Sequence, residues 1–99
     1  MSVSATHSDG GKTLAIKVDG RFDFSAHDEF REAYGGSSAE HYVVDLAGVE
    51  YLDSSALGLM VLLREHAGGE AANVEIINCS TDVRRILTIA SFHRLFQIR

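Results

Sequence analysis

The amino-acid sequence predicts a small α/β protein with a mixed sheet of four to five strands covered by three helices. Apolar side chains alternate along residues 14–18, which is typical of a strand with one buried face. Two apolar runs, 42–46 and 74–79, have the composition of strands inside a sheet, and segments with helical spacing separate them. Strands that alternate with helices pair in parallel through right-handed crossovers, so the predicted order is β-β-α-β-α-β-α-β.

The N-terminal third is predicted to form a hairpin followed by a helix. Residues 3–7 alternate as a short, weak strand, and Asp9-Gly10-Gly11 suits a turn because glycine tolerates a positive φ. The alternation of the second strand continues to Phe24, which puts this ring on the buried face. Ser25 is predicted to cap the first helix, and Gly35-Gly36 to end it.

Beyond Gly36 the pattern predicts a strand, a helix, a second strand, another helix and a last short strand. Their ranges are 42–46, about 54–67, 74–79, about 81–90 and 95–98. Ala47-Gly48 is expected to end the first of these strands. The segment Ser80-Thr81-Asp82 is expected to cap the last helix.

Length and composition bound the class of protein. A chain of 99 residues is expected to form a single domain, residues 1–99. Its longest apolar run, 56–63, is far shorter than the roughly 20 residues of a membrane span, and its start lacks the features of a secretory signal. The one cysteine, Cys79, has no partner for an internal disulfide, so a cytoplasmic location without membrane attachment is the simplest expectation.

The net charge of −5 argues against direct binding of nucleic acid, because nucleic-acid-binding proteins usually present a basic surface. The charge is uneven along the chain. Residues 1–79 carry 5 basic and 13 acidic side chains, or −8, whereas residues 80–99 carry 4 basic and 1 acidic, or +3. We expect the basic part to be a solvated helix face, with an acidic partner as the alternative.

Motifs of common enzyme chemistry are missing from the sequence. It has no phosphate-binding glycine loop, no dinucleotide-binding glycine pattern and no nucleophile elbow. The five histidines are scattered without metal-ligand spacing, and the first strand lacks the acidic cluster with which a phospho-receiver domain binds Mg²⁺. We therefore expect a protein that is not an enzyme and that uses no cofactor or metal.

The informative segment is 51–58, Tyr-Leu-Asp-Ser-Ser-Ala-Leu-Gly, between a strand and an apolar helix. Asp53 or Ser54 is suited to cap this helix by accepting a hydrogen bond from a free backbone N–H. The same helix N-terminus offers donors and a partial positive charge to a phosphate on a serine. Such a phosphate adds about −1.5 to −2 charges without a change of fold, which suits a switch of docking.

Two motifs resemble the signature of STAS domains, in particular of the bacterial anti-sigma factor antagonists. The first is Val43-Val44-Asp45-Leu46 followed by residues 51–58. The second is Gly20-Arg21-Phe22-Asp23, which is similar to a Gly-x-x-Asp at the end of that family's second strand. The element order and the length agree as well, so the resemblance covers nearly the whole chain.

The resemblance implies a regulator that binds an anti-sigma factor when it is unphosphorylated and thereby frees a sigma factor for transcription. A serine kinase, often the anti-sigma factor itself, phosphorylates the serine directly after the aspartate, and a serine phosphatase reverses this. By position the target is Ser54, flanked by Asp53 and Ser55, with Asp23 near it. The alternative is an accessory STAS subunit of an ABC-type or anion transporter, a class that often lacks the Asp-Ser pair.

Two positions depart from the family's pattern. Ala56 stands where glycine is commoner, and Arg21-Phe22 replaces an acidic-aliphatic pair. Alanine favours a helix over glycine by up to about 1 kcal/mol, so Ala56 is compatible with the switch. We expect both departures to affect partner specificity.

The second helix carries more apolar side chains than a buried stripe of about 100° needs. They are Leu57, Leu59, Met60, Val61, Leu62 and Leu63. We therefore expect Leu57 or Met60 to be partly exposed near Ser54 and to contact the partner. The predicted partner-binding residues are Asp23, Asp53, Ser54, Ser55, Leu57 and Met60.

Overall fold

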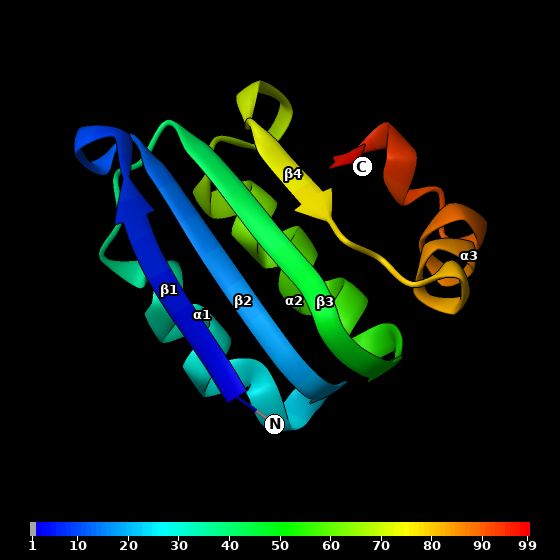
Figure 1. The fold of residues 1–99 in the computed structure, drawn as a ribbon. Coiled ribbons are helices and arrows are strands. Elements are labelled where there is room, and N and C mark those ends of the chain that lie inside the picture. Colours follow the sequence, from blue (N-terminus) through cyan, green and yellow to red (C-terminus); the bar gives the residue numbers. More distant parts are fainter. Residues whose placement is uncertain (1) are drawn as a thin grey trace.

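The computed structural model describes residues 2–99, which form one five-stranded sheet in the order β1-β2-β3-β4-β5 (Figure 1). The strands are β1 (Ser2–Ser8), β2 (Thr13–Phe22), β3 (His41–Leu52), β4 (Val74–Ile77) and β5 (Gln97–Ile98). β1 pairs antiparallel with β2, and the other neighbouring strands pair in parallel. The predicted mixed sheet and order of elements are confirmed.

Three α-helices connect the parallel strands: α1 (His27–Gly35), α2 (Ser54–His66) and α3 (Thr81–Ile89). Figure 1 shows α1 and α2 behind the sheet on the same face, with α3 beyond β4. Right-handed crossovers that always advance to the next strand place successive helices on one face. The Ser80 side chain accepts a hydrogen bond from the Val83 amide at 3.2 Å, which confirms the predicted cap of α3.

The core lies between the sheet and its helices. Leu14, Ile16 and Val18 of β2 are fully buried, whereas Lys17 between them is exposed, as their alternation predicts. No polar or charged residue is buried in the part of the chain that the structure describes. None of the helices between Ser2 and Arg99 has the length and apolar character that crossing a bilayer requires.

β3 differs most from its prediction, because it does not end at Leu46 but continues to Leu52. Its pairing with β2 shifts twice, between Lys17 and Asp19 and between Gly20 and Arg21, so β3 holds extra residues as bulges. A Cβ on Gly48 would collide with the Asp19 carboxylate. Glycine at this position therefore allows β2 to approach β3 closely. The Ala47-Gly48 pair therefore marks a bulge rather than the predicted end of the strand.

Smaller differences lie at other element ends. The fourth strand stops at Ile77, before Asn78, whose φ of 60° takes the backbone out of the extended region. The fifth strand shrinks to Gln97–Ile98, because Phe92 to Arg94 form a short 3-10 helix and Phe96 packs into the core. Phe24 is 65% exposed rather than buried, because β2 ends at Phe22 and the strand alternation ends with it.

Candidate functional site

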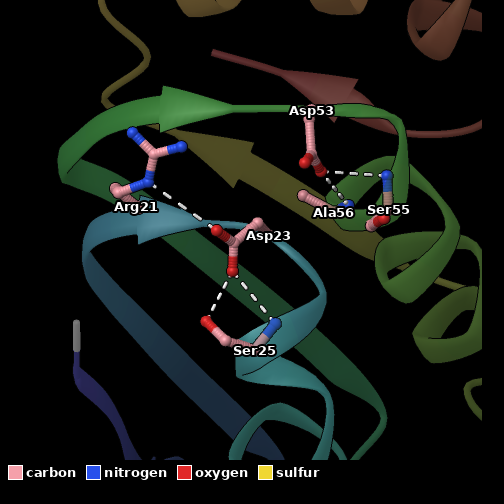
Figure 2. Close-up of polar contacts among 6 residues, drawn as sticks. All are labelled: Arg21, Asp23, Ser25, Asp53, Ser55 and Ala56. Atoms are coloured by element: carbon pink, nitrogen blue, oxygen red, sulfur yellow. Dashed lines mark hydrogen bonds and ion pairs between the residues drawn. The ribbon is translucent and has the colours of Figure 1, made fainter.

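The bulges of β3 bring two aspartates to the same end of the sheet. The last registered pair of β2 and β3 is Phe22 with Leu52, so Asp23 and Asp53 each follow directly after it. Figure 2 shows their side chains at neighbouring strand ends. The expectation that Asp23 lies near the Asp53-Ser54 segment therefore agrees with the geometry.

Asp53 caps α2. One oxygen of its carboxylate, Oδ1, accepts hydrogen bonds from the Ser55 amide at 3.0 Å and from the Ala56 amide at 3.2 Å (Figure 2). Ser54 is the first residue of the helix and is exposed, whereas Ser55 is half-buried. Of the two serines, Ser54 is thus the more accessible to another protein.

The cap changes one part of the sequence argument. A phosphate on Ser54 was expected to find waiting N–H donors, but Asp53 already occupies the Ser55 and Ala56 amides. The Leu57 amide bonds to the Asp53 carbonyl oxygen at 3.2 Å. A phosphate here would therefore stay largely in water, unless it displaced the Asp53 carboxylate.

Asp23 repeats this arrangement on the neighbouring strand end. Its Oδ1 accepts hydrogen bonds from both the amide and the hydroxyl of Ser25. The Ser25 hydroxyl and amide, in that order, hold the pKa of the Asp23 carboxyl below its usual value of 3.8, with a smaller contribution from Arg21. The predicted cap at Ser25 is wrong: Asp23 is the capping residue of the short 3-10 helix 24–26, and α1 starts after it without a side-chain cap.

The two strand ends share a four-residue pattern. Residues 23–26, Asp-Phe-Ser-Ala, correspond to residues 53–56, Asp-Ser-Ser-Ala. In each, the aspartate binds the amide two residues on, and the alanine, Ala26 or Ala56, is fully buried. The second position is exposed in both, so Phe24 occupies after β2 the position that Ser54 occupies after β3.

Arg21 and Tyr51 lie beside the two caps. They are partners in the register of β2 and β3, and the Arg21 guanidinium lies 4.0 Å from the centre of the Tyr51 ring. Arg21 Nε is 3.7 Å from Asp23 Oδ2. Tyr51 is 41% exposed. The arrangement combines an accessible aromatic ring with a cation held over it, a contact worth about 0.5–1 kcal/mol at an exposed site.

Only some of the additional apolar side chains of α2 lie on the surface. Leu57 is half-buried and packs against the core, which agrees with the expected partial exposure. Met60 is 0% exposed, so its predicted contact with a partner is wrong: it fills the core between α2 and the sheet. The most exposed apolar residue of α2 is Leu62, at 52%.

We define the Ser54 surface as Arg21, Phe24, Tyr51, Ser54 and Leu57. The surface positions of Phe24 and Tyr51 were not predicted from the sequence, and Arg21 was predicted only as a departure from a family pattern. The repeat of Asp-x-Ser-Ala at 23–26 and 53–56 was the available signal for Phe24, since it pairs this residue with Ser54. The position of Tyr51 depends on the bulges of β3, which no sequence pattern indicated.

Solved structures share this fold. SpoIIAA, an anti-sigma factor antagonist, matches in its unphosphorylated form with a TM-score of 0.75 and 16% identity, over 99% of this chain and 87% of that one. Its phosphorylated form matches with a TM-score of 0.72 and 16% identity, over 99% and 91%. A sulfate transporter family protein from Wolinella succinogenes matches with a TM-score of 0.74 and 11% identity, over 93% and 80%. The fold is therefore one that occurs in anti-sigma factor antagonists and in a protein of a transporter family.

Sequence relationships define the family. Residues 5–97 match the family model described as "Mlab, STAS domain". A STAS-domain containing protein of Pseudomonas aeruginosa (strain UCBPP-PA14) is 51% identical over 100 residues, which cover 99% of each chain. This chain belongs to the STAS domain family.

Proposed function

We propose that the chain is an anti-sigma factor antagonist: a binding module, not an enzyme, that docks on an anti-sigma factor or a related serine kinase when Ser54 is unphosphorylated. The observation that carries the proposal is the exposed Ser54 on the first turn of α2, directly after the Asp53 cap. The likeness to SpoIIAA, solved in unphosphorylated and phosphorylated forms, supports it. A serine phosphatase would restore the docking state.

The exposed rings of Phe24 and Tyr51 are the proposed anchors for docking. Aromatic residues and arginine are enriched among the side chains that dominate binding energy, and Arg21 lies over one of these rings. Leu57 adds apolar area one turn into α2. Asp23, Asp53 and Ser55 act as positioning residues, because the bond from the Ser25 amide to Asp23 fixes where Phe24 lies and the bond from the Ser55 amide to Asp53 fixes where Ser54 lies.

Phosphate on Ser54 would oppose docking by two effects. It adds a strongly hydrated dianion, and burying a charge without a partner costs several kcal/mol. The carboxylates of Asp23 and Asp53 lie at the same end of the sheet, so repulsion adds to desolvation. A loss of about 3 kcal/mol lowers affinity by roughly a hundredfold or more.

The second candidate function is an accessory subunit of an ABC-type or anion transporter. The observation that favours it is the fold likeness to the sulfate transporter family protein. In that case the partner is a transporter component, and a charge at Ser54 need not control binding.

Affinity capture from a lysate of the source organism separates the two functions. The baits are the Ser54→Ala and Ser54→Asp variants, with Ser38→Asp as a matched control that adds the same charge at an exposed loop residue elsewhere. The proposal expects Ser54→Ala and Ser38→Asp to capture a serine kinase of the anti-sigma type, and Ser54→Asp to lose it. Capture of a transporter ATPase or permease by all three baits would contradict the proposal.

A further inference from the structure

β1 is an edge strand without the usual protection. Its seven residues pair with β2 alone, in a register without a shift. An edge strand presents unpaired N–H and C=O groups on every second residue, and proteins commonly guard it with charged residues, proline or a bulge. The sequence of β1, Ser-Val-Ser-Ala-Thr-His-Ser, has no lysine, arginine, aspartate, glutamate or proline.

The structure leaves this edge open. Six of the seven residues of β1 are exposed, and Val3 is half-buried. In Figure 1 α1 lies behind the sheet, and no strand of residues 2–99 pairs with the outer side of β1. The opposite edge differs, since β5 has two residues and Arg99 directly after it pairs with Glu75, at 3.3 Å between Nε and Oε1. Of the two sheet edges within residues 2–99, β1 is therefore the longer one and the one more readily extended.

We propose that β1 pairs antiparallel with β1 of a second copy, which joins two sheets into one about a two-fold axis perpendicular to them. Val3, Ala5 and His7 lie on the helix side of β1, because they oppose the buried residues Val18, Ile16 and Leu14. Such an axis keeps both sets of helices on the same side. Apart from His7, the side chains that then meet across the new pair of strands are no larger than valine.

Charge favours a second copy as the occupant. Two chains of net charge −5 repel each other, and the repulsion is least where the surfaces in contact are neutral. β1 provides such a surface over its whole length. Because the pairing uses the β1 edge of each copy, the assembly closes at a dimer and does not grow into a fibre. Contact through one pair of strands buries little area, so the dimer is a weak one.

The dimer does not involve the Ser54 surface. α2 follows β3 and is therefore separated by β2 from the dimerising edge. The inference goes beyond the proposed function and does not depend on it. A dimer would carry two Ser54 surfaces, one on each copy.

Sedimentation equilibrium from about 10 µM to about 1 mM tests the dimer by mass action. The edge variant is Ser4→Lys with Thr6→Lys, and the matched control is Ala71→Lys with Thr88→Lys, at exposed residues away from β1. Both variants change the net charge from −5 to −3 by two added lysines. Lower net charge by itself favours association, so a dimer lost only in the edge variant locates the contact at β1.

We expect wild type and the control to dimerise with rising concentration, and the edge variant to stay monomeric with an unchanged melting temperature. In wild type, hydrogen exchange of β1 amides should slow as concentration rises. A monomeric wild type over the whole range, a dimer in the edge variant, or a dimer lost in the control would each overturn the proposal. If the double variant unfolds, Ala5→Lys is measured in its place, with the same expected loss of the dimer.

Discussion

Two aspartates organise the candidate site at the scale of single residues. Asp53 and Asp23 each accept backbone hydrogen bonds at the end of a strand and so fix the start of the next turn. What differs between the two turns is the exposed second residue, a phenylalanine in one and a serine in the other. One turn thus offers an apolar anchor and the other a hydroxyl that a kinase can modify.

The Asp53→Ala variant should be destabilised by about 0.5–2 kcal/mol, because the Ser55 and Ala56 amides lose their acceptor at the N-terminus of α2. Asp53→Asn should lose much less, since the amide oxygen can accept the same bonds. Urea unfolding of both variants measures this. Equal stability of Asp53→Ala and wild type would show that water replaces the cap at no cost.

Lowering the pH should weaken the hydrogen bonds that the Asp23 carboxylate accepts. The pKa of Asp23 is lower in the folded protein than its usual 3.8, so its hydrogen bonds stabilise the fold above that value and are lost as pH falls through the folded pKa. Ser25→Ala removes the first cause of the shift and should raise the pKa of Asp23. An NMR titration of the Asp23 carboxyl carbon measures this, with Ser38→Ala as control. An unchanged pKa in Ser25→Ala would contradict the role of Ser25.

At the scale of elements, β3 and α2 decide where the site lies. Two bulges lengthen β3 so that its end aligns with the end of β2. α2 then buries Ala56, Leu59, Met60 and Leu63 against the sheet and leaves Ser54 on its solvent side. The sequence predicted the existence and type of these elements, but not the bulges, because Ala47-Gly48 has the composition of a turn as much as of a bulge.

Truncation of Met60 should cost much more stability than truncation of Leu62. Met60→Ala leaves a cavity in the core and should cost about 2–5 kcal/mol of unfolding free energy. Leu62→Ala, at a half-exposed residue on the same helix, should change stability by about 0.5 kcal/mol or less. Chemical denaturation of both variants checks this. A similar loss in the two variants would mean that Met60 is not the core residue described here.

The aromatic anchors give a prediction about binding. Phe24→Ala and Tyr51→Ala should each weaken the captured partner's affinity by roughly tenfold or more, since truncated interface anchors commonly cost above about 1.4 kcal/mol. Phe24 is 65% exposed and Tyr51 is 41% exposed, so each truncation should cost less stability than that of a core residue such as Met60. Calorimetric titration measures affinity, and Leu62→Ala serves as an apolar control on the far part of α2. Unchanged affinity in both aromatic variants would remove them from the docking surface.

For the molecule as a whole, the fold could be predicted from the sequence, but only part of the candidate site could. Alternation at Leu14, Ile16 and Val18 and the Asp53-Ser54 segment were sufficient for the sheet, the helix order and the family. The burial of Met60 was not predictable, because it depends on how α2 packs on the sheet, and the exposure of Phe24 was indicated only by the repeat of Asp-x-Ser-Ala. The local sequence pattern determines which secondary-structure element forms, whereas the exposure of a side chain depends on how the elements pack together.

The most direct test of the central claim compares the partner's affinity for protein with phosphoserine at residue 54 and for unmodified protein. Protein with phosphoserine at residue 38, an exposed loop position, controls for charge. We expect a roughly hundredfold or greater loss of affinity for phosphate at Ser54 and little change for phosphate at Ser38. Equal affinity of the two phosphorylated proteins and the unmodified one would contradict this claim.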